Sequence, residues 1–586
     1  MPLHKRFLLV LIKPSHYDDD GYVIQWLRSA IPSNTLAALH GLAVDCAERR
    51  VLGEDVAIEI AAYDETNTRI RPARIARKIA RVGAGMVGLV GVQSNQFPRA
   101  MDIARRLRAS GAQVCIGGFH VSGTLAMLPE MPPELKEAQA LGISLFAGEA
   151  EGRLERVLRD AWAGALKPLY NFMDDLPALE GTPVPILPRR RIQRTTGCLT
   201  SFDAGRGCPF QCSFCTIINV QGRKSRRRSA DDIEQIIRRN VAQGVTRFFI
   251  TDDNFARNKD WEAIFDRIIA LREGEGMDIK FVIQVDTLCH RIPNFIAKAG
   301  RAGVARVFIG LESINPETLL AAKKRQNKIT EYRKMLLEWK RVGTTTYAGY
   351  ILGFPGDTPD SLLRDIEIIK RELPLDLLEF FCLTPLPGSE DHQKLYKRGV
   401  PMDPDLNKYD LEHVTTVHPS MSKAEWEGIY SRAWETFYSP QHIETLMRRA
   451  AATRISAGKT LFLLMWFYAS AFVEKVHPLQ GGYLRLKFRR DRRPGLKRES
   501  PLVFYPRYVG DLVAKHAHMM GVVWKFERLR RRIRKDPHAR DYVDQATTPV
   551  VEDELDTLAL FTANDAAKAA VTKARRDDKA RARMRA

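Results

Sequence analysis

The sequence contains no apolar run long enough to cross a bilayer and no second cluster of cysteines. Its longest strongly apolar stretch, 460–473, has 14 residues, whereas a spanning helix needs about 20. The first residues do not have the anatomy of a signal peptide, so we expect none. Five of the eight cysteines are scattered singly. We therefore expect a cytoplasmic protein without structural disulfides and exclude a membrane-spanning one.

The chain is also too long for a single hydrophobic core. Its 586 residues predict two large domains and a smaller appendage. The net charge is +21, and from residue 441 onward 31 Lys and Arg stand against 16 Asp and Glu. A basic surface of this kind can face nucleic acid, an anionic membrane or only solvent, and the charge leaves all three open.

Residues 1–170 alternate short apolar strands with helical stretches. Strands are predicted at 7–12, 56–60, 86–92 and 113–116. This alternation predicts an α/β domain with a doubly wound parallel sheet, whose ligands bind at the carboxyl ends of the strands. The residues placed there are Ser94, Gly117, Gly118, His120, Gly148 and Glu149. Glycines at strand ends let a backbone approach a bulky ligand, although turns require them too.

A Pro-rich stretch without helical or strand periodicity, 176–188, predicts a linker over 171–197. Residues 198–420 alternate again, with roughly six β/α units. That number is too small for a complete eightfold barrel and predicts a partial (β/α)6 barrel of the TIM type. Residues 421–586 show little strand signal and predict a basic, mainly helical region.

The strongest motif is the triplet Cys208, Cys212 and Cys215, spaced 3 and 2 residues apart. Three thiolates on one loop can bind three irons of a [4Fe-4S] cluster and leave the fourth iron open. That iron can chelate the amino and carboxylate groups of S-adenosylmethionine (SAM), and a reduced cluster can pass an electron to the sulfonium. A structural zinc site would need a fourth ligand nearby, and only Cys198 is at all close.

The triplet, with Phe214 before its last cysteine, resembles the signature of the radical SAM superfamily. The resemblance implies a [4Fe-4S] cluster, SAM and an electron donor such as flavodoxin or ferredoxin. It places Phe214 beside the adenine. Later segments resemble the other SAM contacts of the family. They are Asp252 and Asp253 near the amino group, Glu312 and Ser313 at a strand end, and Gly349, Ile351 and Gly353 beside the adenine.

The N-terminal segment resembles the cobalamin-binding domain that precedes the radical SAM domain in a group of methylases and ring-forming enzymes. Together the two resemblances cover roughly residues 5–420. The Asp-x-His-x-x-Gly motif that supplies a cobalt ligand is absent. Members of the group without it either bind cobalamin with no protein ligand or have lost it. His16 and His120 are the polar side chains near the expected site.

We therefore expect a radical SAM enzyme that cleaves SAM reductively and, with cobalamin, methylates or rearranges an unactivated carbon of a small molecule or lipid. One alternative is a tRNA-modifying methylthiotransferase, but the extra N-terminal cysteine cluster of that family is missing, so nucleic acid is not the expected partner. The other is a non-catalytic cobalamin-binding protein. The stretch 460–473, with its basic flanks, is either a peripheral anchor on the inner face of the membrane or a buried core helix.

Overall fold

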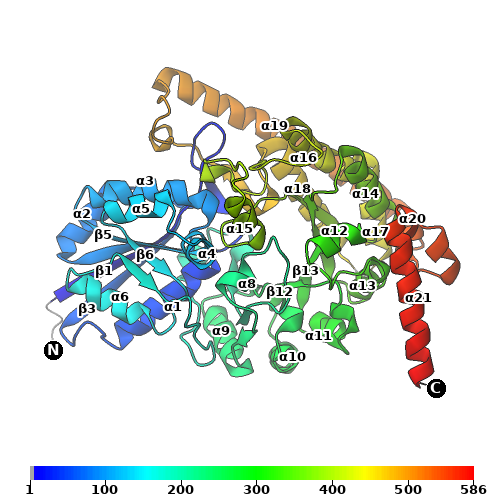
Figure 1. Ribbon diagram of the computed structural model, residues 1–586, viewed down its shortest axis with the longest axis horizontal. Helices are drawn as coiled ribbons and strands as arrows, with labels where there is room; N and C mark the ends of the chain where they lie inside the picture. The colour runs from blue at the N-terminus through cyan, green and yellow to red at the C-terminus, as the bar shows by residue number, and fades with distance from the viewer. Residues whose placement is uncertain (1–4, 454, 586) are drawn as a thin grey trace.

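The computed structural model describes residues 5–453 and 455–585. Its N-terminal part is a six-stranded parallel sheet with helices on both faces (Figure 1). Helices α1 (Asn34–Glu48) and α6 (Leu154–Trp162) cover one face, and α2 (Pro72–Val82) and α3 (Phe97–Arg108) cover the other. The strand order is β3 (Val56–Asp64), β1 (Lys5–Lys13), β4 (Gly85–Leu89), β5 (Gln113–Gly117), β6 (Ser144–Ala147) and β7 (Leu169–Asn171). The predicted doubly wound sheet is confirmed.

The burial and length of its strands explain which parts of this sheet could be predicted from the sequence. In β1, the six residues from Phe7 to Ile12 are all buried, as expected for a central strand that is covered on both faces. Strands β6 and β7 were missed by the sequence interpretation because they have only four and three residues, too few to show a period.

The second sheet is a six-stranded parallel half-barrel, as predicted. Helices α9 (Ala230–Ala242), α10 (Trp261–Ile269), α13 (Ile329–Arg341) and α14 (Pro359–Glu372) pack on its outer surface. In spatial order the strands are β8 (Leu199–Phe202), β11 (Arg247–Ile250), β12 (Lys280–Val285), β13 (Val304–Glu312), β14 (Thr345–Leu352) and β15 (Leu377–Cys382). Since every strand is parallel to its neighbours, all their carboxyl ends lie at one rim.

The C-terminal region is mainly helical and enlarges the core of the half-barrel. It contains α16 (Lys423–Phe437), α17 (Pro440–Ala452), α18 (Ala457–Tyr468), α19 (Pro501–Lys535) and α21 (Asp565–Arg585). Helix α18 buries Leu461, Leu463, Leu464 and Phe467 in that core. The stretch 460–473 is therefore a core helix, and its interpretation as an anchor is wrong. Among the described helices, none combines the length and apolar character needed to cross a membrane.

A two-stranded ribbon joins the beginning of the chain to its C-terminal region. Strand β2 (Trp26–Ser29) pairs antiparallel with β16 (Gly482–Arg485). The buried indole of Trp26 lies on Gly482, where a Cβ would come within 2.1 Å of the ring. Its Nε1 donates to the Gln480 carbonyl over 2.8 Å. The last quarter of the chain thereby contributes to the N-terminal half of the molecule.

The linker packs along α1, and this contact predicts the effect of one substitution. A Cβ on Gly41 would lie 2.1 Å from the Val184 carbonyl oxygen. Gly41→Ala should therefore lower the free energy of unfolding by about 1 to 3 kcal/mol, although alanine favours a helix. Gly428→Ala, in α16 with open space around it, should instead stabilise by up to about 1 kcal/mol. Urea unfolding of both variants tests this, and a stabilised Gly41→Ala variant would contradict the packing.

Candidate functional site

The three cysteines lie on one loop that follows the first strand of the half-barrel. The short strand β9 (Gly205–Arg206) pairs with β10 (Arg226–Arg227) and closes the base of this loop. The Cys208 amide donates to the Gly222 carbonyl over 3.2 Å, and the Cys215 amide donates to that of Cys212 over 3.2 Å. In the middle of the loop, the Ser213 amide donates a hydrogen bond to the Ala322 carbonyl. All three thiols are free, so the loop presents them together at the rim.

The thiols fit a [4Fe-4S] cluster better than a single metal ion. In the described part of the chain, no three His, Cys, Asp or Glu side chains converge as the ligands of one ion would. In a cubane each cysteine binds a different iron, so the three sulfurs need not share one ion. Burial raises the pKa of Cys208 to about 11 and that of Cys215 to about 12. Thiols with so high a pKa stay protonated and are poor nucleophiles. Binding of iron displaces the proton and converts each thiol to a thiolate.

Lys324 supplies a positive charge beside these sulfurs. Burial disfavours its ammonium form, but the charges of Glu312, Cys212 and Cys215 raise its pKa above the usual value. Its Nζ forms an ion pair with Glu312 and lies 5.7 Å from the centre of the Phe214 ring. Lys324 could not be predicted from the sequence, since one lysine among many carries no pattern.

The residues predicted to surround SAM gather around the cluster loop. Phe214 packs in a small apolar group with Ile351 and Phe354, and its ring centre is 6.1 Å from that of Phe354. Glu312 ends β13 with a φ of 63°, a left-handed conformation that non-glycine residues rarely adopt outside functional sites. Ser313 follows it and is buried. The structure thus brings Phe214, Glu312, Ser313 and Ile351 to one rim of the half-barrel, and their contact with SAM stays a prediction.

The two predicted glycines of β14 have packing roles in the structure. A Cβ on Gly349 would lie 3.0 Å from two phenylalanine rings inside the half-barrel. Gly353, with φ of 103°, accommodates Trp426 of α16, whose ring atoms would be 2.0 Å from a Cβ. The Trp426 Nε1 donates to the Leu352 carbonyl over 3.0 Å, and Asp357 accepts the amide of Gly353. The C-terminal region therefore closes the end of this strand.

The adjacent carboxylates Asp252 and Asp253 differ in what they contact. Asp252 accepts hydrogen bonds from the amides of Ala204 and Gly205 at 2.7 and 2.8 Å, and from the side chain of Asn258. Its oxygens therefore hold the strand that leads to the cysteines. The Asp253 carboxylate lines a large cavity, and desolvation by the surrounding protein raises its pKa to about 7. Of this pair, Asp253 is the one free to meet a ligand.

The large cavity, of about 560 Å³, lies between the N-terminal sheet and the half-barrel. The N-terminal sheet contributes Ser94 and His16, the half-barrel contributes Asp253, the segment after β15 contributes Asp410, and the C-terminal region contributes His477. A smaller apolar pocket of about 180 Å³ adjoins it and reaches between α1 and the sheet. The predicted residues Gly117, Gly118, Gly148 and Glu149 line this pocket.

The N-terminal site residues fall into two groups. Gly118, with φ of 153°, passes so close to Val92 that a Cβ on it would lie 2.1 Å from the Val92 amide nitrogen. A Cβ on Gly117 would contact Phe146. These glycines therefore let the chain turn at the pocket wall. His120 lies behind the wall: it is buried, packs 4.4 Å from the Phe97 ring and has its Nδ1 3.2 Å from the Ser94 Oγ. His120 does not line either cavity.

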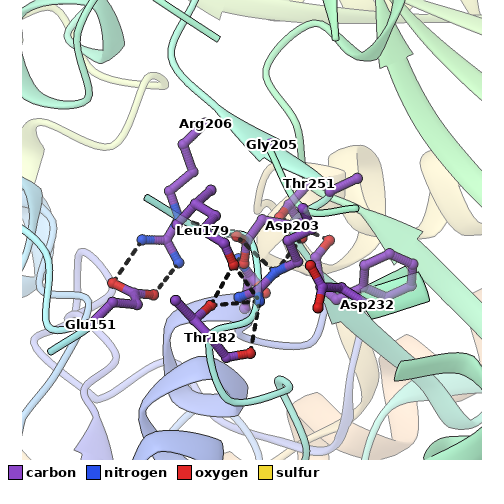
Figure 2. Close-up of polar contacts among 12 residues, drawn as sticks. Glu151, Leu179, Thr182, Asp203, Gly205, Arg206, Asp232 and Thr251 are labelled. Atoms are coloured by element: carbon purple, nitrogen blue, oxygen red, sulfur yellow. Dashed lines mark hydrogen bonds and ion pairs between the residues drawn. The ribbon is translucent and has the colours of Figure 1, made fainter. Parts of the chain in front are cut away.

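A buried ion cluster joins the two halves beside the cysteine loop. Arg206, two residues before Cys208, forms ion pairs with Glu149 and Glu151 of the N-terminal part and with Asp203. Figure 2 shows its pairing with Glu151. Burial disfavours its charge, but the three carboxylates outweigh this and raise the pKa of Arg206. Glu149 also binds Arg226. The sequence interpretation missed Arg206 and Glu151, because pairing across 55 residues leaves no local pattern.

A partial parallel barrel with three free cysteines on its first loop defines an iron–sulfur protein in which one iron stays open to a ligand. Residues 204–369 match the family model of the radical SAM superfamily, and this part of the chain is a radical SAM domain.

Curated relatives include the bacteriochlorophyllide d C-8(2)-methyltransferase of Chlorobaculum tepidum, which is 27% identical over 56% of this chain and 73% of its own. The hopanoid C-2 methylase of Rhodopseudomonas palustris is 24% identical over 68% and 74%. Among solved structures, the radical SAM methyltransferase TsrM of Kitasatospora setae, with cobalamin and a [4Fe-4S] cluster bound, shares the fold. Its TM-score is 0.51 at 15% identity, over 69% of this chain and 80% of that one.

The ion cluster predicts a stability effect. Arg206→Met leaves Glu151 buried without its partner, so the free energy of unfolding should fall by about 3 kcal/mol or more. Arg238→Met, which breaks an exposed ion pair with Glu275, should leave urea unfolding unchanged. Equal unfolding curves for the two variants would show that the cluster does not join the two halves.

Proposed function

We propose that this protein is a cobalamin-dependent radical SAM methylase that transfers a methyl group to an unactivated carbon of a small molecule or lipid. The observation that carries the proposal is the shared cavity. Arg206 and Thr216, which flank the cysteine loop, line it from the half-barrel, and residues that follow the N-terminal strands, such as Ser94, line it from the other side. Relatives over more than half of the chain are methyltransferases of tetrapyrroles and hopanoids, which supports methyl transfer over rearrangement.

The chain's own residues hold the first cofactor pair. Cys208, Cys212 and Cys215 would bind the cluster, which with SAM supplies a 5′-deoxyadenosyl radical able to abstract hydrogen. Lys324 keeps a positive charge beside the cysteines and fixes Glu312. Phe214 provides an apolar ring at the same rim, and Asp253 directs a carboxylate into the cavity.

The N-terminal cavities fit cobalamin in shape and character. The large cavity can accept a broad, partly polar ring system, and the adjoining apolar pocket can accept a flat aromatic ring, such as the one cobalamin carries on its nucleotide tail. His120 is buried away from both cavities, and His16 has its pKa lowered to about 4, chiefly by burial. A neutral His16 stays available as a hydrogen-bond partner at the cavity wall.

The remaining partners belong to the proposal as well. The cavity combines apolar side chains such as Phe249 and Leu386 with Asp410, His477 and Gln480. This mixture suits a molecule that has both an apolar body and polar groups. Reduction of the cluster calls for a small electron-transfer protein such as flavodoxin or ferredoxin. We place the enzyme in the cytoplasm, in peripheral contact with the membrane.

The radical chemistry can be tested without knowing the substrate. Protein reconstituted anaerobically with iron and sulfide, and then reduced, should convert SAM to 5′-deoxyadenosine, measured by chromatography. Cys208→Ala should abolish this conversion because the cluster loses one of three ligands. Cys198→Ala, outside the triplet, should retain it. Wild-type protein that forms no nucleoside, or a Cys208→Ala variant that forms as much, would overturn the proposal.

Cobalamin binding has a separate test in the apolar pocket. Ala38 of α1 lines this pocket and is buried, so Ala38→Phe should fill it and weaken cobalamin binding by about tenfold or more. Glu48→Phe, at the exposed end of the same helix, should leave the affinity unchanged. Titration of hydroxocobalamin followed by absorbance measures both. Unchanged affinity in Ala38→Phe would place the ligand elsewhere.

A further inference from the structure

Helix α19 presents a continuous apolar stripe to solvent. Of the 18 large hydrophobic side chains that are exposed in the described chain, seven lie on these 35 residues. At 3.6 residues per turn, six of them fall within an arc of about 100°. These six, here called the α19 stripe, are Leu502, Tyr505, Val509, Val513, Met520 and Trp524, with exposed fractions from 54 to 87%.

The stripe points away from the protein body. The buried side chains of α19 are Phe504, Val522, Phe526 and Ile533, and they occupy the opposite side of the helix. Since that side already packs against the core, the stripe is an additional apolar surface and has no role in holding the helix in place. Figure 1 shows α19 along the upper edge of the molecule, with its N-terminal half extending beyond the other helices.

Basic residues accompany the stripe. Helix α19 contains nine Lys and Arg against two Asp and Glu. Lys525 is exposed next to Trp524, and the Arg528 guanidinium lies 5.4 Å from the centre of the Trp524 ring. The segment just before the helix adds Arg490, Lys497 and Arg498, all exposed. Five of the nine basic residues of α19 form ion pairs with acidic side chains. The positive charge beside the apolar surface therefore comes chiefly from Lys525, Arg528 and the exposed basic residues before the helix.

We propose that α19 binds in the plane of an anionic lipid surface, with the stripe inserted among the acyl chains and the basic residues at the headgroups. An apolar stripe flanked by Lys and Arg is the pattern of an interfacial helix. The amphipathic rings of Tyr505 and Trp524 belong to the stripe and suit the boundary between headgroups and hydrocarbon. The stripe spans about 33 Å along the helix, from Leu502 to Trp524.

The positive charge around the α19 stripe favours a lipid surface over a second copy of the chain as its binding partner. Two copies paired through the stripe would bring their basic residues together, and this like-charge contact opposes association. An anionic leaflet instead attracts each Lys or Arg near its surface. The inference uses no step of the proposed catalysis and assigns lipid contact to α19, at residues distinct from the buried 460–473 helix.

Vesicle flotation of the full chain tests the proposal. The protein should float with vesicles of phosphatidylcholine and phosphatidylglycerol, and much less with phosphatidylcholine alone. The triple variant Val509→Ser, Val513→Ser and Trp524→Ser should lose this partitioning by roughly tenfold or more. A matched control, Leu320→Ser, Tyr396→Ser and Val417→Ser, removes three exposed apolar side chains elsewhere and should float like wild type.

Formation of 5′-deoxyadenosine by each variant shows that it is folded, and separates a failure of lipid binding from a failure of the proposed chemistry. Three outcomes would overturn the proposal. They are wild type that floats with neither vesicle, a stripe variant that floats like the control, and a wild-type dimer in light scattering that the stripe variant dissociates. The last would assign the stripe to self-association.

Discussion

The ion cluster around Arg206 is the constraint on which the site depends. One guanidinium, buried between Glu149, Glu151 and Asp203, joins the N-terminal sheet to the half-barrel two residues before the first cluster cysteine. A buried charge of this kind contributes little net stability against an apolar substitute, but it strongly penalises any arrangement in which a partner is missing. It therefore fixes the distance and orientation between the two halves more than it holds them together.

Because this orientation is fixed, residues of both the N-terminal sheet and the half-barrel line the large cavity. The strand ends of both sheets open into it. The segment after β15 adds Asp410 to its wall, and the C-terminal region adds His477. Two reactive groups that must exchange a substrate need a common, enclosed space, since binding holds the reacting atoms near one another and excludes competing water. Trp426, packed on Gly353, closes the half-barrel at the same rim.

Sequence reasoning predicted the features that carry a local pattern. The alternation of strands and helices gave both sheets, and the spacing of Cys208, Cys212 and Cys215 gave the cluster loop. Features built from distant parts of the chain were not accessible. Arg206 belongs to the site through a partner 55 residues away in sequence, and β16 pairs with a strand more than 450 residues earlier. Lys324 lies 12 residues from its partner Glu312, but no motif marks it. The apolar run at 460–473 was ambiguous because a buried helix and an interfacial helix share one composition.

The pairing of β2 with β16 has a consequence for how the protein is made. Ala30 and Ile31 at one end of the chain, and Leu479 and Gly481 near the other, form part of the same cavity wall. A ribosome must therefore release more than four fifths of the polypeptide before that wall can close. Until then this side of the N-terminal sheet is open to solvent. Large prosthetic groups can enter it during synthesis and become enclosed when the ribbon forms.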